Sequence, residues 1–208
     1  MILLVGLGNP GARYQGHRHN IGYMAIDAIR TRHRFGPERK RFQGLFSEGE
    51  VETAAGPMKV CTLKPTTYMN ESGRAVAEAV HFYKLDLKDV VVVYDEIDLA
   101  PGKVRVRLGG GVAGHNGLRS IRGHLGPDFR RVRIGIGHPG DKRVVQHFVL
   151  QNFTKGEREW VAPLLDAVAK ATPLLAEGND SEFMNRVHLA TRPIFDRDEP
   201  ADLPPSEE

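Results

Sequence analysis

The sequence contains a single cysteine, Cys61, among 208 residues. One cysteine excludes an internal disulfide, the usual staple of small secreted domains, and favours a reducing compartment. No apolar run approaches the ~20 residues of a membrane-spanning helix, and no charged segment precedes an apolar stretch at the N-terminus, as it would in a secretory signal. These absences predict a cytoplasmic protein that has no membrane partner.

Several signatures of catalysis are missing as well. The chain has no G-x-x-x-x-G-K-[ST] phosphate loop, no G-x-S-x-G nucleophile elbow, no H-E-x-x-H motif and no cysteine cluster. The first absence disfavours an NTPase, although an apolar run ends in the acidic pair Asp95 and Glu96. Cys61 lies in the middle of a predicted strand and is interpreted as a core residue. We therefore expect no metal, no cofactor and no covalent intermediate.

The charge is unevenly distributed along a chain of otherwise ordinary composition. With 208 residues, 40% of them apolar, the chain is long enough for one sizeable core, so a single domain is expected. The last fourteen residues, FDRDEPADLPPSEE, hold six acids and one base, whereas the first 194 carry 28 basic and 20 acidic side chains. A basic body favours a polyanionic partner, although a solvated surface explains the same excess. We place the folded domain at residues 1–190 and an acidic, flexible tail at 191–208.

Apolar periodicity predicts an alternation of strands and helices. The expected strands are 2–5, 45–51, 58–63, 90–94, 104–108 and 132–136. The expected helices are 21–31, 72–83, 116–124, 157–176 and 180–188. This order predicts the α/β class, with a single domain built on a twisted mixed β-sheet flanked by helices.

The chain begins with a match to the dinucleotide-binding fingerprint. Residues 6–11, GLGNPG, fit G-x-G-x-x-G after an apolar strand. A dinucleotide-binding turn requires a helix at the third glycine, but helical periodicity returns only at Ile21, and the acidic Asp27 falls inside that helix. The context disfavours a nicotinamide-dependent oxidoreductase. We interpret the segment as a strand-end loop that exposes Asn9 and returns with His17, His19 and Asn20.

Three asparagines occupy loops between a predicted strand and a predicted helix. They are Asn9, Asn70 and Asn116. An amide side chain offers both a donor and an acceptor, so it can hold a carbonyl oxygen or read a peptide amide. A single loop asparagine usually serves a turn or a helix cap. Three of them, together with a histidine and Asp95 at the end of an apolar strand, favour a site where these loops open on one crevice.

Five segments carry a resemblance that runs in order from residue 1 to about residue 190. They are LVGLGNPGARYQGHRHNIG, KPTTYMNESG, VVYDEIDLAPGKVRVRLGGG, GHNGLRSI and RRVRIGIGHPGD. Together they resemble the bacterial peptidyl-tRNA hydrolases. The resemblance implies a monomeric α/β hydrolase that cleaves the ester between a peptide and the 3′-terminal adenosine of tRNA. Such an enzyme recycles tRNA from peptidyl-tRNAs that drop off during translation.

The resemblance also implies roles for single residues. His19 matches the catalytic base and Asp95 the carboxylate that orients it. Asn70 is our first candidate for the donor to the developing oxyanion and Asn9 the second, while Asn70 and Asn116 match residues that contact the substrate. The remaining matches lie at the pocket beside the 3′ end of the tRNA, where we expect Tyr14, Met69 and His115, the last in a structural role.

Basic residues recur at strand and helix spacing in the second half of the chain. Alternation places Lys103, Arg105 and Arg107 on one face, and likewise Arg131 and Arg133, while Arg119 and Arg122 lie one helical turn apart. A solvated face explains any one row, but several rows favour contact with phosphates. By resemblance, Arg107 and Arg133 hold the 5′ phosphate of tRNA, with arginine at position 107 where lysine is usual.

Two features of the resemblance bear on loops rather than on chemistry. Residues 137–150 resemble a mobile rim over the crevice, and Val112 and Ala113 stand where the family often has smaller or polar residues. A catalytically silent RNA-binding protein of the same fold stays open as an alternative. The intact His19 and Asp95 argue against it.

Overall fold

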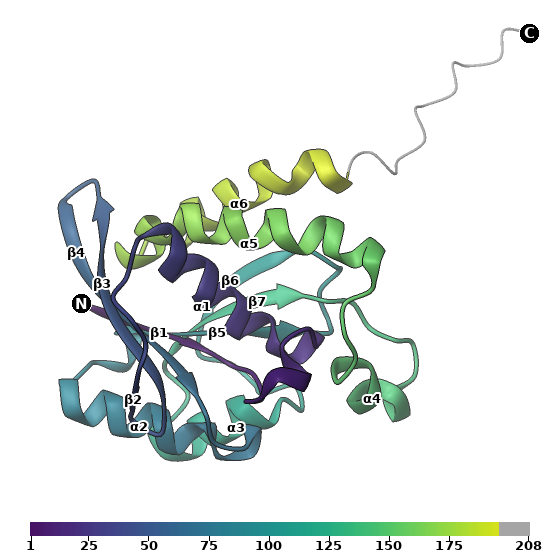
Figure 1. The fold of residues 1–208 in the computed structure, drawn as a ribbon, viewed down its shortest axis with the longest axis horizontal. Helices are drawn as coiled ribbons and strands as arrows, with labels where there is room; N and C mark the ends of the chain where they lie inside the picture. Colours follow the sequence, from purple (N-terminus) through teal and green to yellow (C-terminus); the bar gives the residue numbers. More distant parts are fainter. Residues whose placement is uncertain (196–208) are drawn as a thin grey trace, which may run out of the picture.

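A seven-stranded mixed sheet forms the centre of the computed structural model, which describes residues 1–195. The strands are β1 (Ile2–Gly6), β2 (Arg39–Arg41), β3 (Gly44–Thr53), β4 (Gly56–Pro65), β5 (Val90–Glu96), β6 (Val104–Leu108) and β7 (Arg130–Gly135). Their order is β2-β3-β4-β1-β5-β7-β6 (Figure 1). Strands β4, β1, β5 and β7 are parallel, β3 is antiparallel to β4, and β6 is antiparallel to β7. The predicted α/β fold with a mixed sheet is confirmed.

Helices cover both faces of this sheet (Figure 1). One layer holds α1 (Ile21–Arg32), α5 (Lys155–Ala176) and α6 (Asp180–Phe195), and the other holds α2 (Ser72–Tyr83) and α3 (Asn116–Leu125). Strand β1 is buried along its whole length and sends Leu4 into one hydrophobic cluster and Leu3 and Val5 into the other. Burial on both faces explains why the central strands are unbroken apolar runs rather than alternating ones. Among the helices of residues 1–195, none has both the length and the apolar character needed to cross a membrane.

The opening glycines allow α1 to pack closely on the sheet. A Cβ atom at Gly6 would lie 2.4 Å from the carbonyl oxygen of Gly22, and one at Gly22 would lie 2.3 Å from that of Val93. Between β1 and α1 the chain forms only two 3₁₀ turns, η1 (Ala12–Tyr14) and η2 (Arg18–Asn20). The prediction that no α-helix begins at the third glycine is confirmed. The first glycine of the motif serves helix packing, and Gly11 adopts a φ of 112° in the turn after β1.

The two long C-terminal helices extend beyond their predicted limits. Helix α5 begins two residues earlier than predicted, because Thr154 and Glu157 form a reciprocal capping box. Helix α6 continues to Phe195, with Thr191 buried and the Phe195 ring 6.2 Å from the ring of Trp160. The folded part therefore includes 191–195, which we had assigned to the tail. Residues 196–208 of the predicted tail lie outside the described residues.

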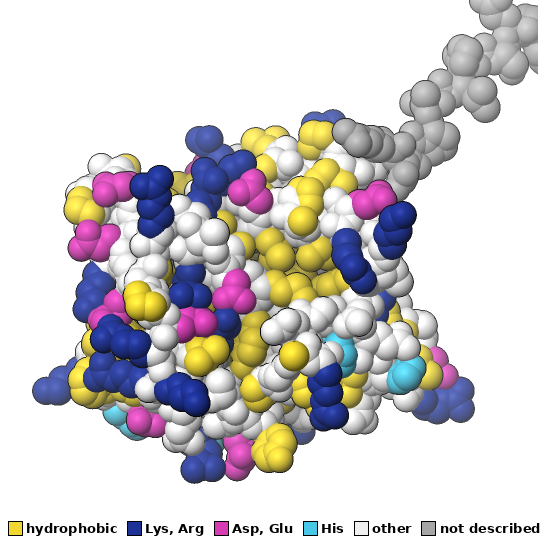
Figure 2. Space-filling view, in the orientation of Figure 1, with side chains coloured by type: hydrophobic (Ala, Val, Ile, Leu, Met, Phe, Trp, Pro, Cys, Tyr) yellow, Lys and Arg dark blue, Asp and Glu magenta, His cyan; other side chains and the backbone are white. Residues whose placement is uncertain are grey.

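Both edge strands of the sheet carry features that oppose pairing with another chain. Strand β2 presents the basic run Arg39–Arg41, and Lys and Arg side chains gather over β2, β3 and β4 on the face shown in Figure 2. At the opposite edge α6 packs against β6, and the backbone N–H of Val106 donates to Met184 Sδ at 3.1 Å. Charged or covered edges are a usual defence against strand addition.

Candidate active site

A cavity of about 490 Å³ lies at the carboxyl ends of β1 and β5. Its walls come from four parts of the chain: the β1–α1 loop, η3 (Met69–Glu71), the end of β5, and residues 112–116, which lead into α3. The outer rim is formed by η5 (Lys142–Val144) and α4 (Val145–Val149), which contribute Lys142, Val145 and Val149. Open α/β sheets commonly bind ligands at this edge. Sequence reasoning placed a rim at 137–150 but did not predict α4.

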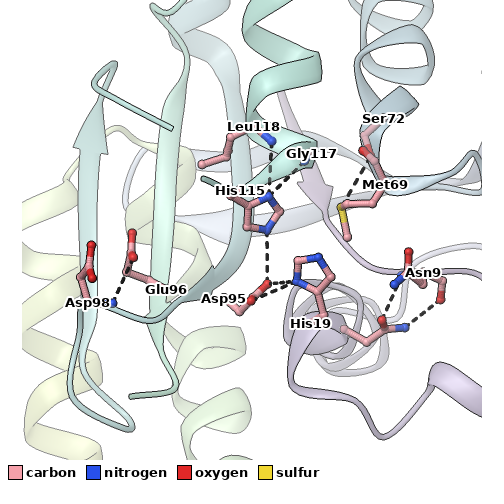
Figure 3. A network of polar contacts seen from close by, with 11 residues as sticks. Asn9, His19, Met69, Ser72, Asp95, Glu96, Asp98, His115, Gly117 and Leu118 are labelled. Carbon is pink, nitrogen blue, oxygen red and sulfur yellow. Dashed lines mark hydrogen bonds and ion pairs between the residues drawn. The ribbon is translucent and has the colours of Figure 1, made fainter. Parts of the chain in front are cut away.

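His19 and Asp95 form an ion pair in the wall of this cavity (Figure 3). Strand β5 places the buried Asp95 at its carboxyl end, and η2 brings His19 Nδ1 to 2.8 Å from Oδ1 and 3.0 Å from Oδ2. A carboxylate can only accept, so Nδ1 carries the proton. Figure 3 shows the other ring nitrogen, Nε2, pointing away from Asp95 on the side of Met69 and Asn9. The neutral ring therefore offers a free lone pair at Nε2.

A second histidine, His115, donates to the same carboxylate. Its Nδ1 caps helix α3 by accepting from the backbone N–H groups of Gly117 at 3.1 Å and Leu118 at 3.4 Å. The proton must therefore be on Nε2, which lies 3.3 Å from Asp95 Oδ1. The helix cap fixes the tautomer of His115, and the ring in turn holds Asp95. This geometry suits the structural role that we expected for His115.

The same contacts decide the protonation of the pair. Burial disfavours an ionised Asp95, but the charge of His19 and the hydrogen bonds from both rings outweigh it and hold the pKa of Asp95 well below its usual range. For His19 burial favours the neutral ring, yet the charge and the hydrogen bond of Asp95 raise its pKa above the ordinary value. Asp95 is thus a permanent carboxylate, and His19 is a base strengthened by it.

Asn9 is held at the cavity by Asn20, the residue that follows His19. The buried Asn20 amide accepts from the backbone N–H of Asn9 and donates to the carbonyl oxygen of Asn9, both at 2.9 Å. The two hydrogen bonds tie the turn after β1 to η2, so Asn9 and His19 keep a fixed relation. Sequence reasoning named Asn20 only as part of the loop. The sequence signal that could have indicated a role for Asn20 is its position directly after His19 in the R-H-N segment.

Asn116 reaches the cavity by a longer route than we predicted. Strand β6 runs antiparallel to β7, so Leu108 pairs with Arg130 at the edge away from Asp95. The glycine-rich segment 109–115 then returns to the cavity, and Ala113 adopts a φ of 43°, in the left-handed region that favours glycine. Asn116 is exposed at the cavity and accepts from Arg119 Nη1 at 3.1 Å.

Two residues predicted for the pocket do not line it. Asn70 is exposed within η3, whereas its neighbour Met69 is buried and faces the cavity. Tyr14 is half-buried in η1, with the guanidinium of Arg13 4.4 Å above its ring and the ring of His17 at 5.2 Å. The structure thus brings together six of the predicted site residues: Asn9, His19, Met69, Asp95, His115 and Asn116.

The predicted phosphate contacts lie on β6 and β7, except for Lys103, which directly precedes β6. Lys103, Arg105 and Arg107 are exposed, and Arg105 and Arg133 face each other across the two strands. The Nε of Arg133 donates to Glu96 Oε2 at 3.0 Å, so the residue after Asp95 orients this arginine. Sequence reasoning had not assigned Glu96 a role.

Arg131 differs from its neighbours on the same face. Its side chain is 2% exposed, donates to the carbonyl oxygen of Gly111 and lies 4.5 Å from the ring of Phe129. The prediction that Arg131 belongs to the phosphate-binding row is wrong, because its side chain is buried. Alternation gave its face correctly, but the segment 109–115 covers that part of the face.

One group of potential metal ligands occurs among the described residues. His19, Asp95 and His115 offer ligand atoms that all lie within 4.8 Å of one another. The hydrogen bonds from both rings to Asp95, and the helix cap at His115 Nδ1, account for this clustering without an ion. The expected absence of a metal stays a prediction.

The geometry above can be compared with known proteins. The family model for peptidyl-tRNA hydrolases matches residues 3–194. The chain belongs to this family.

Relatives and solved structures agree with this assignment. The peptidyl-tRNA hydrolase of Parvibaculum lavamentivorans is 62% identical over 194 residues, which cover 93% of each chain. That of Bradyrhizobium sp. strain ORS 278 is 60% identical over 190 residues, covering 91% of this chain and 92% of the relative. The crystal structure of peptidyl-tRNA hydrolase from Acinetobacter baumannii has a TM-score of 0.83 at 37% identity and covers 90% of this chain and 94% of that one.

Proposed function

We propose that this chain hydrolyses the ester bond between the peptide and the 3′-terminal adenosine of peptidyl-tRNA, and so recycles tRNA during translation. The observation that carries the proposal is the His19–Asp95 pair in the cavity wall, in a chain of this family. No cofactor is required in this scheme, because an ester is a reactive acyl donor and a positioned water can serve as the nucleophile.

The reaction follows from the free Nε2 of His19. Water attacks the ester carbonyl carbon while Nε2 takes its proton, and Asp95 stabilises the imidazolium that forms. The tetrahedral intermediate then expels the ribose oxygen, which receives the proton back from Nε2. General base assistance of this kind is typically worth a factor of ~10²–10⁴ in rate.

The developing oxyanion needs a donor, and Asn9 is better placed for this than Asn70. Asn9 lines the cavity together with His19, whereas Asn70 is exposed outside its lining. One preorganised donor is worth a factor of ~10²–10³. Asn116, which also lines the cavity, is placed to read the amide of the last peptide bond. Such contacts favour peptidyl-tRNA over aminoacyl-tRNA, which carries a free ammonium group there.

Turnover of two tRNA substrates tests the proposal. Release of the acyl group is measured from N-acetyl-aminoacyl-tRNA and from the matching aminoacyl-tRNA with a free amine. We expect rapid release from the first and little from the second. Tight binding of both without release would instead support the alternative, an RNA-binding protein that kept the fold and lost the activity.

The pH dependence of the reaction follows from the raised pKa of His19. Only the neutral ring accepts a proton, so activity is present above the pKa of His19 and is lost as the pH falls through it. Asp95, with its lowered pKa, stays ionised over this range. We expect log kcat/KM to rise with pH and to level off with an apparent pKa above ~6.5, the ordinary value for histidine. A profile that is flat from pH 5 to 8 would contradict the assignment of the base.

The exposed basic residues on β6 and directly before it, with Arg133, are proposed to hold the tRNA backbone. Phosphate contacts of this kind contribute affinity that depends on salt and not on sequence. In this proposal Arg107 and Arg133 bind the 5′ phosphate, and Lys103 and Arg105 contact the backbone beside it.

Substitution of Arg107 by alanine measures one of these contacts. We expect weaker binding of tRNA, a salt slope of log K smaller by about one, and nearly unchanged kcat, because Arg107 is remote from the reacting atoms. The matched control is Arg39→Ala, an exposed arginine on the opposite edge strand β2. Equal losses of tRNA affinity in both variants would show that binding depends only on the overall charge of the protein and not on a contact at Arg107.

We also propose that the protein acts as a monomer in the cytoplasm. The protected edges of the sheet, with charged β2 on one side and covered β6 on the other, favour a chain that does not pair with copies of itself. Its single cysteine suits a reducing compartment.

A further inference from the structure

Arg18, the residue before His19, makes an unusual set of contacts for a charged side chain. It is only 4% exposed, and its Nε and Nη2 donate to Oε1 and Oε2 of Glu157 at 2.9 and 2.6 Å. A buried charge is tolerated only where it is paired and its donors are satisfied, and a two-point arginine–carboxylate pair meets this condition with a fixed geometry. These contacts lead away from the cavity, so the mechanism above leaves Arg18 without a role.

The same guanidinium also holds the end of the rim helix α4. Nη1 donates to the carbonyl oxygen of Phe148 at 3.2 Å, and the guanidinium lies 4.3 Å from the centre of the Phe148 ring. Carbonyl groups in the last turn of a helix have no partner within the helix. The carbonyl oxygen of Phe148 accepts from Arg18 and also from the backbone N–H of Gln151, at 3.2 Å. Since Val145 and Val149 of α4 line the cavity, Arg18 links the outer wall to the turn that carries His19.

Backbone pairing strengthens this link. The N–H of Arg18 donates to the carbonyl oxygen of Gln151 at 3.0 Å, and the N–H of Phe153 donates to that of Gly16 at 2.9 Å. Glu157 is itself fixed, because it accepts from the N–H of Thr154 at 2.7 Å in the capping box of α5. The turn η2, the rim helix α4 and the start of the long helix α5 therefore meet at one side chain.

We propose that Arg18 is a positioning residue for the hydrolysis proposed above: it fixes α4 against η2, so that the cavity wall keeps the spacing at which His19 meets the ester. The inference rests on that proposed function. Arginine is required because one planar group must satisfy a carboxylate, a helix-end carbonyl and an aromatic face together. Lysine keeps the charge but offers a single nitrogen.

The variant Arg18→Lys tests the proposal with two readouts. We expect kcat on N-acetyl-aminoacyl-tRNA to fall by a factor of ~10–100, since small displacements of reacting groups have effects of this size. KM should stay nearly unchanged, because the exposed β6 surface that we propose for tRNA is untouched. Without substrate, amide hydrogen exchange over residues 142–150 should be faster than in the unchanged protein. The matched control is Arg158→Lys, an exposed arginine next to Glu157 that donates to the carbonyl oxygen of Phe153.

A second variant, Glu157→Gln, removes the charge of the partner and keeps its shape. We expect the same two effects, with no further loss when it is combined with Arg18→Lys, because both act through one contact. Unchanged exchange over 142–150, an unchanged kcat, or faster exchange spread evenly over β5 and α5 would each overturn the proposal. The exchange readout needs no turnover, so inactivity of the unchanged protein would overturn the proposed function alone.

Discussion

The variant His19→Ala is expected to lose a factor of ~10²–10⁴ in kcat, the typical contribution of a positioned general base. The reason is that Nε2 is the free basic nitrogen of the His19–Asp95 pair and faces the cavity away from the carboxylate (Figure 3). Binding of tRNA should persist, because Arg105 and Arg107 of β6 and Lys103 directly before it are unchanged. The measurement is single-turnover release of the acyl group, paired with tRNA binding by filter retention.

The control for this variant is His17→Ala, two residues earlier on the same loop. His17 is half-buried and does not line the cavity. Its backbone forms a β-bridge to Asn152, in the segment between α4 and α5. Its replacement should leave kcat within about twofold, as expected for a group that touches neither the base nor the substrate. If His19→Ala retained most of the rate while His17→Ala lost it, our assignment of His19 as the base would be wrong.

The layered fold could be predicted because each element carries its own periodic signal. The apolar runs of β1 and β5 indicate burial on both faces, and the helical spacing in 21–31 and 72–83 predicts α1 and α2 closely. The pair His19 and Asp95 followed from strand-end chemistry together with the resemblance. The glycines at 6 and 22 support the same packing, since only a missing side chain lets α1 approach β1.

The rest depends on contacts between distant segments, which leave no local pattern. Alternation put Arg131 and Arg133 on one face, but only the crossing of 109–115 decides that Arg131 is covered while Arg133 stays partly exposed. Asn70 and Met69 are neighbours, yet η3 turns only Met69 inward. Arg18 pairs with a residue 139 positions away in sequence, and no spacing rule connects them.

The second large effect is expected for Asp95→Asn, and the tautomers explain it. His115 must keep its proton on Nε2, because its Nδ1 accepts from the first amides of α3. The amide oxygen of the new side chain is therefore needed at the Oδ1 position, where His115 donates. The NH₂ group then occupies the Oδ2 position, 3.0 Å from Nδ1 of His19, and presents a donor to the Nδ1–H, whose remaining acceptor is the amide oxygen at the Oδ1 position, 2.8 Å away. With its proton moved to Nε2, the His19 ring accepts from this NH₂ group instead, so we expect the substitution to favour that tautomer.

A proton on Nε2 removes the lone pair that should accept from water, so the base is present but in the wrong form. Asp95 stabilises the imidazolium and raises the pKa of His19 by its charge. Loss of the carboxylate removes both effects. We expect kcat to fall by a factor of ~10⁴, the size known for the same change in serine proteases. The control is Asp98→Asn, exposed just beyond β5, where only the backbone N–H contacts Glu96. A loss below tenfold in Asp95→Asn, with the fold intact by circular dichroism, would mean that His19 is oriented by something other than Asp95.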